Sequence, residues 1–338
     1  MAETESKTVD LNIHSTGVEI PAAAMDLFLN GADGTGGFLG TSAVARLARV
    51  MQIPGAGVKT TIVTGDPEAD WVEDSEEKPV DTPKLQTKTL IPYTLAVIVP
   101  MSNRFRANKE ALANYIMGDL PRVLAEKFDK TVLQGGAPGT TGSNGNTAAS
   151  NGFDTLQDAQ AVVAADGSMY TAIADAMSGI ATSGGTMSGF ILSPQGNAAV
   201  MKSRAKDGGL EFPGYMPGSG QLMGLPCFTS TSAYISSTTG EDTSSSNGAN
   251  TLGFAGDWSK AVVGIVNDVS IELGEHSITD NGKQINLWQR NMFAIRAEME
   301  VGFVVADTKY FQRLTDKADT STSTAKAGTA KTGSAKAA

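Results

Sequence analysis

The chain has 338 residues, of which 41% are hydrophobic and 18% are charged, so its composition is that of a largely globular protein. Cys227 is the single cysteine and there are two histidines, which argues against an internal disulfide and against a zinc site built from several thiolates or imidazoles. The net charge is −10, and the body before the last 23 residues holds 22 basic and 34 acidic side chains, which argues against a nucleic-acid-binding surface.

Residues 1–54 are predicted to form an extended arm with little core of its own. This segment holds a short apolar patch around Phe28 and then a glycine-rich stretch at 31–37. Apolar residues at 44–51 recur close to helical spacing, but the run is too short to predict a helix. The glycines do not fit the GxGxxG pattern and no βαβ unit surrounds them, which argues against a dinucleotide site.

A long β-hairpin is predicted at 56–99, because residues 58–64 and 84–99 are rich in β-branched and apolar residues. The connecting segment has seven carboxylates in residues 66–77, so it cannot form a packed core and is predicted to project as a tip. Asp66, Glu68 and Asp70 have the spacing of calcium ligands, but Trp71 stands where a calcium-binding loop needs glycine. A solvated run of charge is the favoured interpretation of this segment.

Residues 107–134 carry the strongest helix signal, with apolar residues at three- and four-residue spacing and Gly135-Gly136 after them. Pro121 lies inside this run, so we expect a kink, or a helix that starts again after Asp119. Residues 136–152 are predicted to be a linker.

The second half of the chain is predicted to alternate between helices and strands. Helices are expected at 155–164, 168–182 and 194–206, with a strand at 189–192 and a loop at 236–250. Residues 260–314 are expected to be mostly β, and they include a half-buried strand in which apolar residues alternate from Ile295 to Phe303. Residues 316–338 have the composition of a disordered tail.

The sequence offers little that could carry catalysis. It contains no phosphate-binding GxxxxGK loop and no GxSxG nucleophile motif. No stretch approaches the about 18 apolar residues needed to cross a membrane. We expect no metal site, no cofactor and no membrane contact. The arm and the hairpin together are far longer than ordinary loops, which favours coverage by neighbouring molecules over flexible loops.

Read in order, several short motifs resemble the major capsid proteins of tailed bacteriophages, which have the Hong Kong 97 (HK-97) shell fold. The resemblance covers roughly residues 18–315, and each motif alone is weak. The motifs are Val18–Pro21, Arg46–Val50, Ala69–Glu73, Glu77–Pro79, Val99–Ser102, Phe128–Gly135, Phe190–Pro194, Gly224–Cys227, Gly256–Ser259, Ala261–Gly264 and Leu287–Asn291.

The resemblance implies an α+β fold with five parts. These are an N-terminal arm (1–54), an extended β-hairpin loop (55–92), a peripheral domain with a long spine helix (93–135 and 257–315), an axial domain (136–256) and the tail (316–338). It also implies self-assembly as pentamers and hexamers into an icosahedral virion shell around double-stranded DNA, without sequence-specific contacts to the DNA.

Two sets of residues then become candidates for contacts between copies. The acidic tip, with Glu73, Glu76 and Glu77, is expected to lie on basic residues of a neighbour's spine helix, for which Arg122, Lys127 and Lys130 are the candidates. The alternative is that the acidic tip only keeps the subunits soluble. Exposed ion pairs contribute only about 0.2–1 kcal/mol each, so such contacts set register more than affinity.

The family's namesake joins its subunits by a Lys–Asn isopeptide bond, and the matching positions here are Lys78, Asn291 and Glu298. The alternative is that Glu298 is a structural ion-pair partner and that no crosslink forms. Asn291 and Glu298 are separated by an odd number of residues, so a regular strand places them on opposite faces.

The resemblance also implies partners and alternatives. Only about 20 residues precede the arm motifs, so a separately encoded scaffold protein is expected, together with a portal. Assembly would take place in the host cytoplasm. The alternative functions are an encapsulin-like compartment shell and a soluble enzyme of unknown chemistry.

Overall fold

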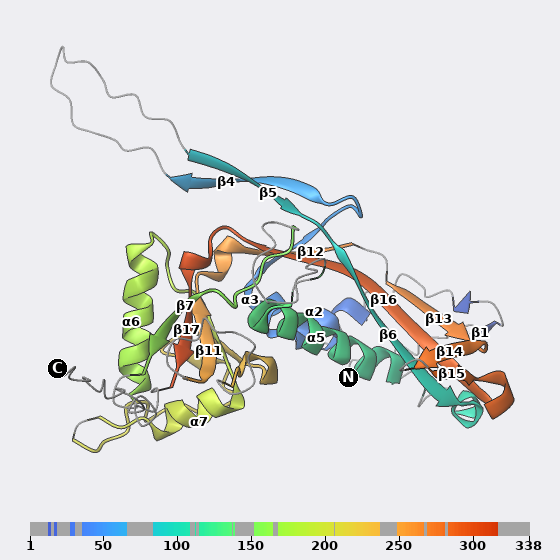
Figure 1. Cartoon of the computed structure of the whole chain (residues 1–338). Coiled ribbons are helices and arrows are strands. Elements are labelled where there is room, and N and C mark those ends of the chain that lie inside the picture. Colours follow the sequence, from blue (N-terminus) through green and yellow to red (C-terminus); the bar gives the residue numbers. More distant parts are fainter. Residues whose placement is uncertain are drawn as a thin grey trace, which may run out of the picture.

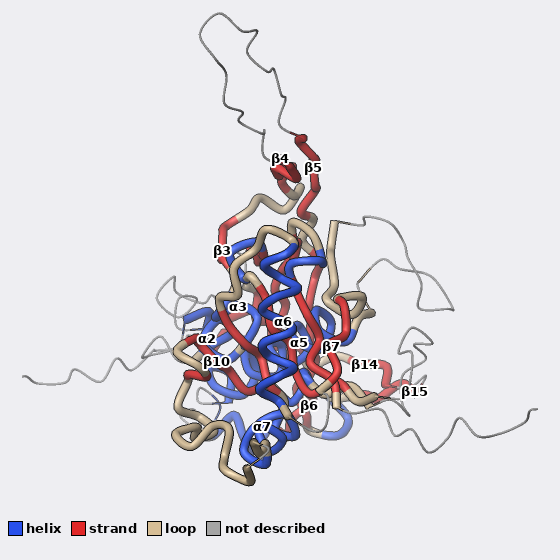
Figure 2. Tube along the Cα trace, turned by 90° about the vertical axis from the view of Figure 1, so that its left-hand side faces the viewer, coloured by secondary structure: helices blue, strands red, loops and turns tan. Residues whose placement is uncertain are grey.

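The structure is a computed structural model that describes residues 13–14, 17–18, 28–30, 36–65, 84–108, 112, 115–136, 138, 152–164, 168–205, 207–236, 249–266, 269–280 and 283–316. Two bodies, each built around a β-sheet, lie side by side, and a β-hairpin projects away from them (Figure 1). The view turned by 90° shows the hairpin standing clear of both bodies (Figure 2).

The first body is organised by one long strand, β16 (Met292–Val305). Strands β6 (Tyr93–Ser102), β13 (Ser270–Gly274) and β12 (Ala261–Ile265) pair antiparallel with it, and β3 (Arg49–Gln52) pairs parallel with β12. The predicted alternation is confirmed, because Ile295, Ala297 and Met299 are buried while the residues between them reach the other face.

Helix α5 (Leu120–Gln134) packs its apolar side against the core that it shares with β16. Pro121 occupies the first turn, where an absent N–H has no helical partner to lose, so the helix starts there instead of kinking. The expected restart after Asp119 is therefore confirmed, and a π-helical turn (Tyr115–Asp119) precedes it. Phe128 meets Phe303 of β16 with ring centroids 6.4 Å apart.

The arm corrects one prediction. Helices α2 (Gly37–Thr41) and α3 (Ala43–Leu47) pack against α5, and β3 completes the edge of the first sheet. Phe28, Phe38 and Val44 are fully buried in the main core. The expectation that the arm has little core in its own molecule is wrong for these residues. Ser42 divides the segment into two helices of five residues each, too short to show a helical repeat in the sequence.

The second body contains a six-stranded sheet in the order β7-β17-β11-β8-β10-β9. Helices α6 (Met169–Thr182) and α7 (Pro194–Lys202) belong to this body, and a second core of apolar side chains lies between α6 and the sheet. The strands are β7 (Gln160–Val163), β8 (Gly189–Leu192), β9 (Gln221–Leu222), β10 (Leu225–Thr229), β11 (Thr251–Gly256) and β17 (Phe311–Thr315).

Two helix predictions in this body change. The helix predicted at 155–164 is wrong, because β7 forms there and pairs parallel with β17, as suits the β-branched Val162 and Val163. Helix α7 ends at Lys202, four residues earlier than expected. Its Ser193 N-cap and the Ser168 N-cap of α6 are as the helix starts require.

The hairpin consists of β4 (Val58–Gly65) and β5 (Lys84–Leu90), paired antiparallel. The return strand predicted as one piece at 84–99 is two strands, because β5 pairs with β4 whereas β6 pairs with β16. Pro92 lies at the break and has no N–H to donate to a ladder. Most of the linker at 136–152, the loop at 237–248 and the tail from 317 lie outside the described residues.

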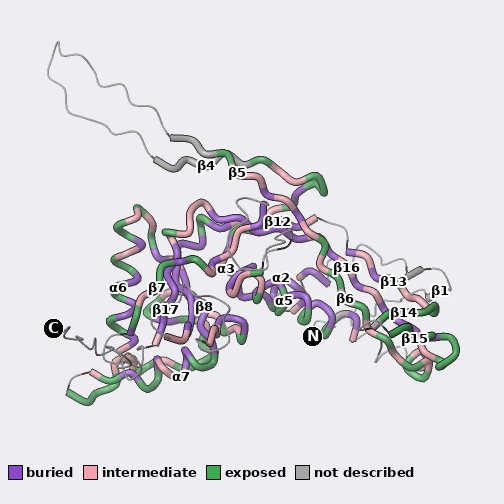
Figure 3. The backbone as a smooth tube through the Cα atoms, in the orientation of Figure 1, coloured by how far each residue is buried: buried purple, intermediate pink, exposed green. Residues whose placement is uncertain are grey.

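The remaining elements are short. Strands β1 (Ile13–His14) and β2 (Gly17–Val18) pair with each other, as do β14 (Ser277–Asp280) and β15 (Lys283–Asn286). Short helical turns are η1 (Asn103–Ala107), η4 (Thr231–Ala233), η5 (Trp258–Lys260), η6 (Trp288–Arg290) and η7 (Thr308–Tyr310). Burial is concentrated in α5, β16 and the sheet of the second body (Figure 3). Within the described ranges, no helix has the length and apolar character of a membrane span.

Candidate assembly surfaces

The base of the projecting hairpin is fixed by a polar contact and close packing. Lys88 of β5 donates to Asp154 Oδ2 at 2.8 Å and to the carbonyl oxygen of Val305 at 2.7 Å. Asp154 Oδ2 also accepts from the backbone N–H of Val305 at 3.0 Å. Leu90 is fully buried beside this contact, and Gly57 adopts a φ of +77° that lets the chain pass close to it. The hairpin therefore leaves the body in a defined direction.

The acidic tip itself lies outside the described residues. Glu73, Glu76, Glu77 and Lys78 fall within the stretch 66–83 that connects β4 to β5. Their predicted contacts stay predictions, and only the strands that carry them have a described place.

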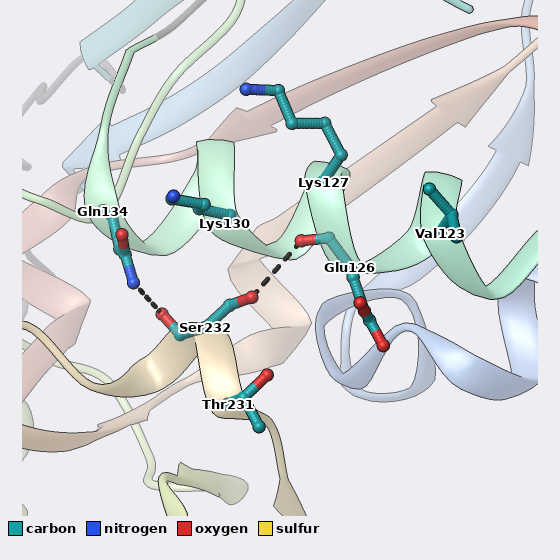
Figure 4. A pocket seen from close by; sticks show the side chains of 7 residues that line it. All are labelled: Val123, Glu126, Lys127, Lys130, Gln134, Thr231 and Ser232. Atoms are coloured by element: carbon teal, nitrogen blue, oxygen red, sulfur yellow. Dashed lines mark hydrogen bonds between the residues drawn. The ribbon is translucent and has the colours of Figure 1, made fainter. Parts of the chain in front are cut away.

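The outer face of α5 borders an open hollow of about 400 Å³ (Figure 4). Turn η4 forms its other wall and is held to the helix by two hydrogen bonds: Gln134 Nε2 donates to the Ser232 carbonyl oxygen at 2.9 Å, and Ser232 Oγ donates to the Glu126 carbonyl oxygen at 3.2 Å. Lys127 and Lys130 line the hollow from the helix, and both are exposed. Within the described ranges, neither forms an ion pair.

Arg122 differs from these two lysines. Its guanidinium donates to Glu126 Oε1 at 2.8 Å and to Asp119 Oδ1 at 3.4 Å within the same helix. The hydrogen bond to Glu126, followed by the one to Asp119, raises the pKa of Arg122. Of the three basic candidates, Arg122 is thus already engaged with its own helix, and the lysines present the available charge.

The crosslink candidates Asn291 and Glu298 lie in different surroundings on β16. Asn291 ends η6 in the left-handed conformation, with φ 55° and ψ 47°, and its Oδ1 accepts from Asn103 Nδ2 at 2.7 Å. Glu298 is half-buried, and its Oε1 lies 3.3 Å from Arg296 Nε. Seven residues of strand span about 23 Å, so one copy of the chain does not bring these two groups together.

One polar junction was not predicted from the sequence. Asp129 of α5 is buried and accepts from the N–H groups of Ala43 at 2.9 Å and Val44 at 3.4 Å. The hydroxyl of Ser42 donates to its Oδ1, and that of Ser230 lies 3.4 Å from its Oδ2. Loss of solvent by burial raises the pKa of Asp129 to about 6 despite these donors. The carboxylate thus joins the arm, the spine helix and the second body.

A sign of this junction exists in the sequence. Asp129 directly follows Phe128 within the apolar stripe of the predicted helix, where an acidic side chain needs hydrogen-bond donors. The sequence does not show which donors these are, because Ser42 and Ser230 are 87 and 101 residues away.

Groups suited to catalysis or metal binding are scarce in the described part of the chain. No cluster of three or more His, Cys, Asp or Glu residues there could hold a metal ion. Cys227 is buried, and its burial raises the pKa of the thiol to about 11, so the thiol is protonated at neutral pH.

Comparisons with known proteins agree with this arrangement. The family model described as "Phage capsid family" matches residues 36–316. A curated relative, "Probable major capsid protein gp17" of Mycobacterium phage D29, is 24% identical over 298 residues, which are 82% of this chain and 85% of that protein.

Solved structures share the fold. A chain from Gordonia phage Cozz matches with a TM-score of 0.60 and 19% identity, covering 82% of this chain and 87% of that one. A chain from Mycobacterium phage Ogopogo gives 0.62 and 20%, covering 82% and 92%. A chain described as "Capsid of native GTA particle computed with C5 symmetry" gives 0.54 and 16%, covering 93% and 97%.

Proposed function

This chain belongs to the phage capsid family, and we propose that it is the major capsid protein of a tailed phage, many copies of which form an icosahedral head shell around double-stranded DNA. The protein is a structural component of the virion with the HK-97-type fold, and its family is not one of enzymes.

The observation that carries the proposal is the projecting hairpin on a body of this fold. In the described residues, β4 and β5 pair only with each other and make a two-stranded sheet outside both bodies. An isolated two-stranded sheet is marginally stable in water, so contact with neighbouring copies supplies the missing cover. Apolar burial, at about 25 cal/mol per Å², is the main driving force for such contacts.

We assign the parts of the chain as an arm (1–54), an extended loop (55–92), a peripheral domain (93–135 and 257–315), an axial domain (136–256) and a tail (316–338). The division into two sheets supports this assignment. One adjustment follows from strand pairing: β17 belongs with the axial sheet, because it pairs with β11 and β7.

The acidic tip of one copy, with Glu73, Glu76 and Glu77, contacts the hollow beside a neighbour's spine helix in this proposal. Lys127 and Lys130 support it, since both point outward from α5 without an ion pair in the described part of the chain. Charge complementarity of this kind selects the partner and the register of the contact.

A covalent bond between copies is the finer part of the proposal. The amine of Lys78 attacks the side-chain carbonyl carbon of Asn291, an isopeptide bond forms, and ammonia leaves as the original amide C–N bond breaks. Glu298 takes the proton released by the amine. Because Asn291 and Glu298 are about 23 Å apart along β16, the groups must come from different copies.

Other partners follow from the same function. A portal and a separately encoded scaffold protein take part in assembly, and the packaged DNA is held without sequence-specific contacts. The relatives named above are from phages and a GTA particle, which favours a shell around DNA over an enzyme compartment.

Electron microscopy of the purified, concentrated protein tests the proposal. We expect closed shells of uniform size, either from the protein alone or when the scaffold protein is co-expressed. A folded protein that stays monomeric under both conditions would contradict the proposed function.

A further inference from the structure

Two turns form one exposed tip at the end of the peripheral sheet. Turn η1 follows β6 and turn η6 precedes β16, and the two are joined by the Asn103–Asn291 side-chain hydrogen bond and by a bond of 3.1 Å from the Asn103 N–H to the Asn291 carbonyl oxygen. Figure 1 shows this end of β6 and β16 far from the projecting hairpin. We call these two turns the aromatic tip.

The aromatic tip exposes two large rings. Trp288 is 80% exposed and Phe105 is 51% exposed. Single exposed apolar residues need no explanation, but two aromatic side chains on adjoining turns form a patch suited to a partner. Trp is also among the residues that dominate the binding energy of protein interfaces.

The same turns also expose two guanidinium groups. Within the described ranges, Arg104 and Arg290 form no ion pair, whereas Arg106 is bound by Glu275 and lies 5.5 Å from the ring of Phe293. The tip therefore offers rings with electron-rich faces and cations that lack a partner. These are the two halves of a cation–π contact.

The turn that carries Trp288 is rigid. Leu287 anchors it in the interior, and its carbonyl oxygen accepts from the N–H groups of Arg290 at 3.1 Å and Met292 at 2.9 Å. Asn291 closes the turn in the left-handed conformation, which asparagine tolerates well. A contact residue held in place before binding loses little entropy when the partner arrives.

We propose that the aromatic tip is a contact point between copies of this chain, in which Arg104 and Arg290 of one copy lie against the rings of Trp288 and Phe105 of the next. The occupant is the same tip of another copy, because the tip is complementary to itself when ring and cation alternate around a closed group of copies. This inference rests on the proposed shell function and adds the side chains that would join its building units.

The variant Trp288→Ala tests the contact. We expect it to raise the protein concentration needed for shell formation about tenfold, which corresponds to about 1.4 kcal/mol. Trp288→Phe and Arg290→Lys should have smaller effects, because a ring or a cation is retained. Gln289→Ala changes an exposed side chain of the same turn that is neither ring nor cation, and it should assemble like the wild type.

Two further measurements test who the occupant is. The fluorescence of Trp288, taken as the difference between wild type and Trp288→Phe, should be quenched by acrylamide before assembly and protected in shells. In shells of Gln289→Cys, a short bismaleimide should join neighbouring copies, since Cys227 is buried.

The outcomes separate this inference from the proposed function. If wild-type protein forms shells but Trp288→Ala does so at the same concentration, or Trp288 stays equally quenched, the tip contact is refuted. If bismaleimide yields only monomers, another surface occupies the tip and the pairing of tips is refuted. If the wild type forms no shells with its scaffold, the proposed function itself fails.

Discussion

Lys88 and Asp154 connect the base of the projecting hairpin to the start of the second body, with 2.8 Å between Nζ and Oδ2. Both side chains are about three-quarters buried, and Lys88 also bonds the end of β16 through the Val305 carbonyl oxygen. Three segments that are distant in sequence thus meet at one ammonium group, which sets the direction in which the hairpin leaves the molecule.

The variant Lys88→Met should lower the free energy of unfolding by about 1–2 kcal/mol, because the Val305 carbonyl oxygen loses its charged donor. Thermal unfolding monitored by circular dichroism measures this loss. Lys59→Met is the matched control: Lys59 lies on β4 of the same hairpin and is exposed, so its replacement should change stability by less than about 0.5 kcal/mol. Equal losses in both variants would contradict the role given to Lys88.

Asp129 should give stability a measurable pH dependence. Its pKa is raised from 3.8 to about 6 in the folded protein, so between these values the folded state keeps a proton that the unfolded state has released. The contribution of Asp129 to stability therefore falls as pH rises from about 4 to 6 and is constant above that range.

Asp129→Asn removes this titration and serves as the test. The free energy of unfolding of the wild type, measured by urea denaturation relative to Asp129→Asn, should decrease by up to about 3 kcal/mol between pH 4 and pH 7. A constant difference between the two proteins across this range would show that Asp129 is ionised throughout.

Reversal of charge at Lys127 and Lys130 should impair shell formation while the subunit stays folded, since both side chains are exposed. The double variant Lys127→Glu/Lys130→Glu would repel the acidic tip of a neighbour. Arg122→Gln is the control, because it breaks only pairs within α5, worth about 0.3–0.5 kcal/mol each. Electron microscopy and light scattering distinguish shells from free subunits, and normal shells from the double variant would exclude this docking site.

Crosslinking predicts covalent ladders when mature shells are boiled in detergent and separated by electrophoresis. Lys78→Arg keeps the charge but has no amine nucleophile, so it should give only monomers. Lys59→Arg, on the same hairpin, should leave the ladders intact. A single monomer band from the wild type would show that Asn291 serves only to close its turn and to hold Asn103.

Local signals in the sequence were sufficient for several elements. The strand around Ile295 to Phe303 shows its two faces in its own alternation, and the start of α5 follows from Pro121. The region 155–164 was misjudged because a short strand such as β7 is stabilised by its partner β17, about 150 residues later. Likewise, the buried place of Phe38 depends on its contact with Phe128, at a centroid distance of 5.6 Å, which no local pattern reveals.

The candidate surfaces were only partly predictable for the same reason. The sequence identified Arg122, Lys127 and Lys130 as basic residues of one helix, but their difference arises from neighbours at three- and four-residue spacing that pair with Arg122 alone. The aromatic tip requires η1 and η6, 188 residues apart at the Asn103–Asn291 bond, to meet.

The central position of β16 in its sheet has a consequence for synthesis of the chain. Strand β6 is complete when residue 102 has been made, yet its partner β16 ends at residue 305. A nascent polypeptide on the ribosome therefore cannot finish this sheet until translation is almost over. Unfinished chains lack the framework that carries the contact surfaces, and premature joining of partial products is thereby discouraged.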